Sequence, residues 1–324
     1  MNQAADQAGA ARKIPRARVA ATDRRQPRRI PWFQGIRRQS VVGWLFVIPA
    51  LLFYGAFVLQ PLVLTVQYSL YRWDGVGPAS WVGLANYASV LSEPKLLETL
   101  FNAFRLVLFF SLIPVALGLV TASVIHRVAT GRLGAVSRTV LFLPQVIPLV
   151  AAGIIWGRLL SLSGLVNEGL ASIGLGGITR AWLGDFDTAL PAVGIIGIWV
   201  LLGFCTVVLL TGMTKIAAAL FESARLDGAG WLQEFRAITV PGLRHEIGVC
   251  ITVTMIAALA AFDIVYVSTG GGPGNATAVP GIQIYIIAFL ERQVGLASAL
   301  AVVLVVLVLL VILPIQRLSR EEAR

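Results

Sequence analysis

The sequence predicts an all-α, polytopic membrane protein with six transmembrane helices. Of its 324 residues, 57% are hydrophobic and only 13% are charged, whereas about a quarter of the residues of a soluble domain are charged. The mean hydropathy is +0.82. Six apolar stretches reach the about 20 helical residues that cross a hydrocarbon core about 30 Å thick. Soluble fold classes account poorly for this composition.

The predicted spans follow one another along the chain with polar segments between them. They cover approximately residues 42–70, 101–126, 137–160, 189–213, 246–268 and 293–316. Prolines lie in or near several of them, and membrane helices tolerate proline where neighbouring helices satisfy the freed backbone groups. We expect kinks at these prolines, which are Pro49, Pro61, Pro114, Pro144 and Pro148. Cys205 and Cys250 lie within spans, where we expect small apolar side chains rather than a disulfide.

Basic residues are concentrated on one side of the predicted membrane. The net charge is +10, and a run of arginines precedes the first span. The N-terminal tail, the loop between spans two and three, the loop between spans four and five and the C-terminus carry most of the Lys and Arg residues. The positive-inside rule therefore predicts that both termini are cytoplasmic.

These features divide the chain into a membrane domain with a tail at each end. Residues 1–41 read as a basic, disordered cytoplasmic tail near anionic headgroups rather than a nucleic-acid-binding region. The apolar run that follows is too long for a signal-peptide core and has no cleavage site, so we expect a retained first helix. The membrane domain is predicted at 42–316, with a C-terminal tail at 317–324.

The cytoplasmic loop at 214–245 has more internal organisation than a simple connector. Residues 216–226 favour one short helix, and Gly228 can adopt the left-handed conformation that closes it. A second helix is predicted from about 230 to 240, ending at Pro241. The apolar side chains among the charges must be buried against the bundle or in a partner; they are Phe221, Leu226, Trp231, Leu232 and Phe235.

Within this loop, E-S-A-R-L-D-G-A-G at 222–230 and I-T-V-P-G-L at 238–243 resemble the EAA loop of ABC importer permeases. The closest likeness is to the carbohydrate type, which includes the larger maltose-permease subunit and its glycerol-3-phosphate and oligosaccharide relatives. The matching positions are Glu222, Ala224, Asp227, Gly228, Ala229 and Pro241. Two positions depart from the pattern: Ser223 replaces the middle alanine, and Ala217 stands where proline is usual.

Other segments resemble the same family in the same order. They are G-L-A-N-Y at 83–87, F-L-P-Q-V-I-P at 142–148, W-L-G-D at 182–185 and F-D-I-V-Y-V-S-T-G-G-G-P-G-N-A-T at 262–277. The resemblance thus extends from about residue 42 to 316. We expect the glycines at 270–274 to form a turn rather than a phosphate-binding loop, because no soluble strand–helix unit follows them.

The resemblance implies a type I ABC importer permease fold and a subunit without its own motor. The chain has no G-x-x-x-x-G-K-[ST] motif to hold nucleotide phosphates, so ATP and Mg²⁺ would be used by a separate ATPase dimer. The other implied partners are a second homologous permease, an extracytoplasmic solute-binding protein on the outer loops, and lipid. The residues expected to contact the ATPase are Glu222, Ser223, Ala224, Arg225, Leu226, Asp227, Gly228 and Ala229.

Candidate residues for a substrate path combine aromatic faces with hydroxyl, amide or carboxylate groups. They are Asn102, Gln145, Trp156, Trp199, Thr206, Asp263, Tyr266, Gln283 and Tyr285. Ionisable groups within spans are functional candidates by default, and Asp263 and Arg105 are the clearest cases. For Asp263, which nears the outer leaflet, we favour the structural alternative, in which it pairs with a neighbouring helix or with water. We expect no metal site, because no His/Cys/carboxylate cluster has suitable spacing, no nucleic-acid partner and no catalytic residues.

The resulting prediction is a permease subunit that imports a sugar, an oligosaccharide or a related polyol across the inner membrane and is not itself an enzyme. Two alternatives stay open at this point. An ion-coupled secondary transporter would act alone and should contain inverted repeats with paired broken helices. A membrane scaffold without transport activity would make the EAA resemblance accidental.

Overall fold

The computed structural model describes residues 32–128 and 132–321. The chain divides into two compact units, residues 1–58 and 59–324. The helix α1 covers Trp32–Tyr54 of the first unit and runs into a π-helical turn, η1, at Gly55–Leu59, whose last residue is the first of the second unit. Residues 32–41 of the predicted disordered tail are thus helical, while residues 1–31 lie outside the described part of the chain.

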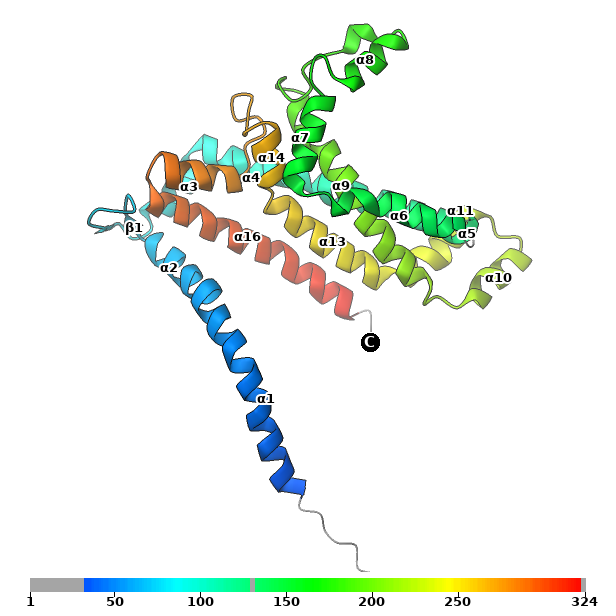
Figure 1. Cartoon of the computed structure of the whole chain (residues 1–324), viewed down its shortest axis with the longest axis horizontal. Coiled ribbons are helices and arrows are strands. Elements are labelled where there is room, and N and C mark those ends of the chain that lie inside the picture. The colour runs from blue at the N-terminus through cyan, green and yellow to red at the C-terminus, as the bar shows by residue number, and fades with distance from the viewer. Residues whose placement is uncertain (1–31, 129–131, 322–324) are drawn as a thin grey trace, which may run out of the picture. The chain divides into compact units, whose positions relative to one another are not determined.

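The second unit is helical apart from one short hairpin within its described residues (Figure 1). Its first half contains α2 Gln60–Tyr68, β1 Tyr71–Arg72, β2 Ser80–Trp81, α3 Ala85–Ser92, α4 Pro94–Val107, η2 Leu108–Leu112, α5 Ile113–Val128, α6 Arg132–Val146, α7 Leu149–Leu159, α8 Leu165–Ser172 and η3 Gly176–Ile178. Its second half contains α9 Ala189–Met213, α10 Ala218–Leu226, α11 Trp231–Glu234, η4 Phe235–Thr239, α12 Val240–Gly242, α13 Arg244–Leu259, α14 Asp263–Ser268, α15 Pro280–Tyr285, η5 Ile286–Leu290 and α16 Val294–Glu321.

The described residues contain four continuous helices that are long and apolar enough to cross a membrane. They are Gly43–Tyr68, Pro94–Val128, Ala189–Met213 and Val294–Arg317. Two further helix pairs pass the same test together but are sharply bent, so the number of spans reaches six if each bent pair is one span. The second span begins at Pro94 rather than near residue 101, and it contains the π-helical turn η2.

The span predicted at 137–160 differs from the structure, because it is bent rather than continuous. Residues 134–146 and 149–159 meet at an angle of 96°. Pro148 is the N-cap of α7, with an extended ψ of 137°. Proline lacks the backbone N–H that would continue α6, and it restricts the residue before it to extended conformations. The bend is therefore much sharper than the kink that we expected from proline.

The span predicted at 246–268 also differs from the structure. Its helix α13 ends at Leu259, and α14 begins only at Asp263. At its other end, residues 231–242 and 244–259 form a bent pair with an angle of 72°. The break after Leu259 contains neither proline nor glycine, so no local residue type marked it in the sequence.

Helix α9 lies at the centre of the second unit and packs against α5 and α6. The packing is close because glycine removes side-chain volume at the contacts. A Cβ atom on Gly203 would overlap the Leu141 carbonyl oxygen, and one on Gly197 would overlap the Phe110 ring. Small residues at such contacts allow membrane helices to approach each other closely.

Three apolar clusters lie along the second unit. One joins α9 to α4, α7 and α14 around Leu106, Val193 and Ile264. A second joins α5, α9, α10 and α13 around Leu209, Phe221 and Leu243. A third joins α3, α4 and α16. Cys205 and Cys250 are buried in the second cluster as free thiols, which confirms the expectation of small apolar side chains.

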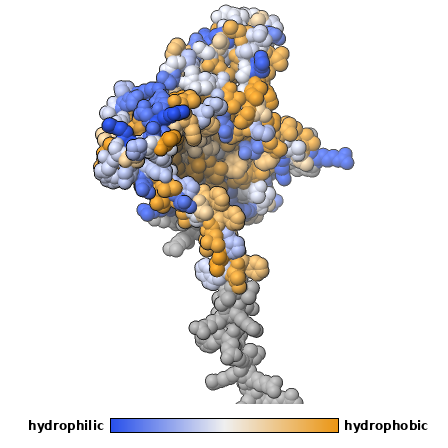
Figure 2. All heavy atoms as spheres, turned by 60° about the vertical axis from the view of Figure 1, so that its left-hand side comes forward, coloured by the Kyte–Doolittle hydropathy of each residue, from blue (hydrophilic) through white to orange (hydrophobic). Residues whose placement is uncertain are grey.

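Apolar side chains also cover much of the surface. Figure 2 shows them spread across the visible face, with hydrophilic residues gathered in separate patches. Large exposed hydrophobic residues occur in both units, among them Phe46, Phe57 and Leu310. Apolar surface on this scale is typical of contact with lipid or with another membrane subunit.

Candidate functional site

The loop at 214–245 folds into two short helices that meet at a sharp elbow. Helix α10 ends at Leu226, and Gly228 follows with φ +80°. The Gly228 N–H donates to the Arg225 carbonyl at 3.1 Å, and the Ala229 N–H donates to the Ala224 carbonyl at 2.9 Å. This pair of bonds is the Schellman motif, which closes a helix through a left-handed residue. The predicted turn at Gly228 is confirmed, although α10 begins at Ala218 rather than at residue 216.

Helix α10 has one buried apolar residue and several exposed ones. Phe221 is buried in the cluster shared with α5, α9 and α13, and its ring lies 5.5 Å from that of His126. Leu226, the last residue of the helix, is 89% exposed, and Leu220 is also exposed. Phe221 therefore attaches the helix to the bundle, while the two leucines leave apolar surface exposed.

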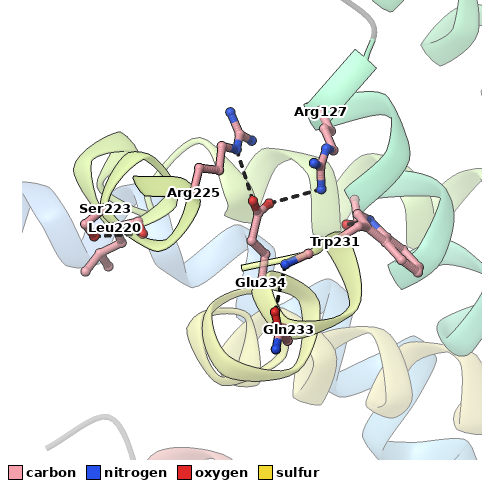
Figure 3. Close-up of polar contacts among 9 residues, drawn as sticks. Arg127, Leu220, Ser223, Arg225, Trp231, Gln233 and Glu234 are labelled. Carbon is pink, nitrogen blue, oxygen red and sulfur yellow. Dashed lines mark hydrogen bonds and ion pairs between the residues drawn. The ribbon is translucent and has the colours of Figure 1, made fainter. Parts of the chain in front are cut away.

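Helix α11 is attached to α5 by polar contacts (Figure 3). Glu234 is buried, and its carboxylate accepts from Arg225 Nε at 3.0 Å and from Arg127 Nη1 at 3.5 Å. The Trp231 indole N–H donates to Ser123 Oγ at 3.0 Å. The Gly230 N–H, at the start of α11, donates to the Gln233 side chain at 2.8 Å.

An ion pair also joins the two ends of the loop. Lys215 Nζ lies 2.8 Å from Glu246 Oε1. Lys215 follows α9, and Glu246 lies in the first turn of α13. The ion pair therefore holds the end of α9 close to the start of α13, where the loop leaves and re-enters the helix bundle.

Most of the residues predicted to contact an ATPase are exposed on this elbow, whereas Ala224 and Ala229 are half-buried. Glu222, Ser223 and Asp227 are exposed, and Glu222 and Asp227 form no ion pair within the described residues. Ser223 Oγ donates to the Leu220 carbonyl at 3.1 Å. The hydroxyl of the serine that replaces the usual alanine is therefore bonded to the backbone of its own helix. Arg225 differs from the others because its guanidinium is engaged by Glu234.

A second candidate site is a cavity of about 470 Å³ at the two helix breaks. The α6–α7 break contributes Gln145 and Pro148, and the α13–α14 break contributes Phe262 and Asp263. The Gln145 Oε1 atom is buried and has no hydrogen-bond partner within the described structure. Asp263 is exposed. The lining of the cavity is thus mostly apolar but includes the Gln145 amide, the Asp263 carboxylate and the Phe262 ring.

Aromatic residues of the predicted path cluster next to this cavity. Phe262, in the cavity wall, stacks on Tyr266 at 5.1 Å between ring centroids, and Tyr285 contacts Tyr266 edge-on at 5.7 Å. Trp156 and Trp199 form a separate edge-on pair at 5.8 Å, packed against the apolar cluster that Phe262 also contacts. Through Phe262, the structure therefore brings Tyr266 and Tyr285 close to the cavity that Gln145 and Asp263 line.

Three other predicted path residues are fully buried. Asn102 donates to the Ala278 carbonyl at 3.0 Å and accepts from Arg105, so its amide holds the segment between α14 and α15. Thr206 donates to the carbonyl one turn earlier in α9. The Gln283 Oε1 atom is buried without a partner among the described residues. Arg105 pairs with Glu98 at 2.6 Å.

The turn predicted at the glycines of 270–274 is confirmed. Gly270, Gly271 and Gly274 have positive φ angles of 61°, 91° and 51°. Within the described residues there is no group of three His, Cys, Asp or Glu side chains that could hold a metal ion.

Arg127, Ser123 and Glu234, which attach the loop, were not identified from the sequence, nor was Phe110 in the cavity wall. Arg127 and Glu234 are far apart in the sequence, and Ser123 and Arg127 lie at the end of another span. The one available pattern was the spacing of Ser123 and Arg127, four residues apart on a helix, which places them on one face.

Comparison with known proteins identifies relatives along most of the chain. Residues 114–320 match the family model described as binding-protein-dependent transport system inner membrane component. The chain is 34% identical over 271 residues to the probable ABC transporter permease protein YurN of Bacillus subtilis, covering 83% of this chain and 92% of the relative. It is 32% identical over 275 residues to the trehalose/maltose transport system permease protein MalF of Thermococcus litoralis, covering 82% of this chain and 89% of the relative.

The fold is also similar to that of a solved transporter. A chain of the bacterial alginate ABC transporter, crystallised in complex with an alginate pentasaccharide-bound periplasmic protein, superposes with a TM-score of 0.76 at 22% identity. The match covers 90% of this chain and 97% of the other. At this identity the likeness concerns the fold.

Proposed function

This chain belongs to the family of binding-protein-dependent transport system inner membrane components, and from that premise we propose what it carries and how it is driven. It is a membrane-embedded permease subunit of an ABC importer, a transport component and not an enzyme. We propose that it moves a sugar, an oligosaccharide or a related polyol across the cytoplasmic membrane, with both termini in the cytoplasm.

The elbow of the 214–245 loop carries the proposal that a separate ATPase drives transport. Its outer side combines an apolar residue at the helix end, Leu226, with the exposed acids Glu222 and Asp227. A short helix with apolar and charged residues exposed together suits insertion into a groove of another protein. We propose that residues 222–229 dock on an ATPase dimer that hydrolyses ATP with Mg²⁺, while this chain binds no cofactor.

The cavity at the helix breaks supports a polyhydroxylated solute. Gln145 and Asp263 offer acceptors and an amide donor, and Phe262 offers an aromatic face. Ligand sites typically combine a largely apolar wall with a few polar groups that fix orientation. The Thermococcus litoralis relative is named for trehalose and maltose, which supports the same solute class for this chain. Its substrate path would run past Gln145, Asp263, Tyr266 and Tyr285.

The remaining partners follow from the same proposal. A second homologous permease would complete the translocation pathway and would cover part of the exposed apolar surface together with lipid. An extracytoplasmic solute-binding protein would deliver the sugar to the outer segments around the β1–β2 hairpin, α8 and the 269–278 turn. The alginate transporter of similar fold was crystallised with such a periplasmic protein, which supports this arrangement.

The docking proposal is tested by placing a charge where the apolar contact is expected. In Leu226→Asp, insertion into an apolar groove would desolvate a carboxylate, so we expect the ATPase subunits co-purifying with the detergent-solubilised complex to fall roughly tenfold, equivalent to about 1.4 kcal/mol. The matched control is Leu162→Asp, at an exposed leucine on the segment that we place outside the membrane. Equal ATPase recovery from Leu226→Asp and Leu162→Asp would contradict docking through this elbow.

The ion-coupled secondary transporter has no support from the family match or from the two relatives described above, which are named as an ABC transporter permease and as a transport-system permease. We therefore do not propose it.

A further inference from the structure

We infer that Glu234 is a positioning residue that clamps the elbow of the 214–245 loop onto α5, so that α10, α11 and the adjacent end of α5 move together as one body. The inference rests on the proposed docking of α10 to an ATPase. It adds a way for a displacement of α10 to be transmitted to α5, because the loop between them would not bend.

The first support is the environment of the Glu234 carboxylate. Its side chain is only 5% exposed, and each oxygen faces a different arginine: Oε1 faces Arg225 and Oε2 faces Arg127. Three separate elements meet here, since Arg225 belongs to α10, Glu234 to α11 and Arg127 to α5 (Figure 3). A carboxylate removed from water is tolerated when charged partners and hydrogen bonds compensate it, and losing one partner is costly. The burial of Glu234 therefore ties the three elements together.

The second support is a neutral contact beside this ion-pair network. The Trp231 indole N–H donates to Ser123 Oγ, a buried hydroxyl of α5. Ser123 and Arg127 are four residues apart on α5, and Trp231 and Glu234 are three apart on α11, so each pair lies on one face of its helix. Two contacts between the same two faces fix the orientation of α11 on α5 better than one contact could.

The third support is the position of the Arg225–Glu234 pair relative to the turn. Arg225 precedes Gly228 and Glu234 follows it, so the pair bridges the elbow from one side to the other. Without it, the angle between α10 and α11 would rest on the backbone bonds of the Schellman motif and on the packing of Phe221. The ion pair thus restrains the angle between α10 and α11, which the glycine alone would leave free to vary.

The experiment measures whether α10 and α5 keep their separation when nucleotide is bound. The full complex with its ATPase subunits is reconstituted in lipid nanodiscs, and spin labels are attached to cysteines introduced at the exposed positions Ala219 on α10 and Val124 on α5. Cys205 and Cys250 are buried and should label poorly. Pulsed electron paramagnetic resonance then gives the label distance without nucleotide and after trapping with Mg-ATP and vanadate.

With Glu234 intact, we expect one narrow distance that is the same in both states. In Glu234→Gln we expect a broad distribution that shifts when nucleotide is trapped, while ATP hydrolysis stays within roughly twofold of the intact complex because the nucleotide sites are distant. Arg127→Gln should broaden and shift the distance in the same direction but to a smaller extent, because the Arg225–Glu234 and Trp231–Ser123 contacts remain. It also serves if Glu234→Gln is poorly folded. Arg127→Gln combined with Glu234→Gln should be no worse than Glu234→Gln alone, since the Arg127–Glu234 pair is already lost in that single variant.

The matched control is Arg236→Gln. Arg236 is an exposed arginine of the same loop, and its side chain makes no ion pair or hydrogen bond in the part of the chain that the structure describes. It should behave like the intact chain.

A narrow, unshifted distance in both Glu234→Gln and Arg127→Gln would overturn the clamp, as would additive effects in the double variant. Loss of ATPase co-purification in Glu234→Gln would also overturn it, because Glu234 would then act in docking. Failure of the docking proposal is recognised separately, by ATPase recovery that Leu226→Asp does not change.

Discussion

At the scale of single residues, the loop at 214–245 depends on one glycine and one buried acid. Gly228 supplies a backbone conformation that other residues adopt at a cost, and Glu234 supplies a charge that two arginines compensate. The glycine could be predicted from the sequence, because its place after a short helix matches a known capping pattern. The acid could not, because its importance arises from Arg127, which the chain brings close only through the packing of α5.

Gly228→Val should uncouple ATP hydrolysis from transport. The site has open space, since no atom lies within 4 Å of a Cβ built there, so the effect would come from backbone strain of about 1–2 kcal/mol in the left-handed region. We expect the solute transported per ATP hydrolysed to fall roughly tenfold in proteoliposomes that contain the full complex.

The control for this prediction is Gly228→Asn. Asparagine tolerates the left-handed conformation far better than a β-branched residue does, so its coupling should lie close to that of the native glycine. If valine and asparagine gave the same transport per ATP as glycine, the conformation of the elbow would have no role in coupling.

At the scale of helices and their connections, the positions of the spans followed from hydropathy, but their breaks did not follow equally well. Pro148 pointed to a disturbance between α6 and α7, although not to a bend of 96°. The break after Leu259 has no proline or glycine, and it is held by packing of α14 against α7 and α9. Long-range packing of this kind overrides local propensity and cannot be read from residue types.

These two breaks create the cavity, so the proposed substrate path is a property of the connections between helices. Asp263→Asn and Gln145→Ala should each raise the KM for uptake several-fold, since each loses part of the hydrogen bonding to a sugar, worth about 1 kcal/mol per neutral bond. Transport by the reconstituted complex would be measured with radiolabelled trehalose and maltose, which are chosen because a relative is named for them.

A matched control for the cavity is Thr139→Ser, at an exposed threonine of α6 that does not line it. ATPase co-purification should be unchanged in all three variants. A KM equal to that of the native chain in both Asp263→Asn and Gln145→Ala would remove the cavity from the path. Neither Asn102 nor Thr206 belongs in this test, because their polar groups are already engaged within the fold.

At the scale of the whole molecule, the features of the chain are those of one part of a larger assembly. It has the fold of an importer permease, a loop at 214–245 with exposed apolar residues, and extensive apolar surface in both units. The fold class and the family could be predicted from composition and from the motifs at 222–230 and 262–277. The solute could not be predicted, because the aromatic residues that bind sugars are of the same types as those that lie at membrane interfaces, and the sequence does not distinguish them.

The central claim, that this chain imports a solute by means of ATP hydrolysed on partner subunits, is tested most directly by uptake into proteoliposomes. The permease pair, the ATPase dimer and the binding protein are reconstituted together, and accumulation of radiolabelled sugars is followed with no ion gradient. We expect uptake that requires Mg-ATP on the ATPase side and stops when the ATPase is omitted. Uptake that continues without the ATPase, or that follows an imposed proton or sodium gradient without ATP, would contradict the account.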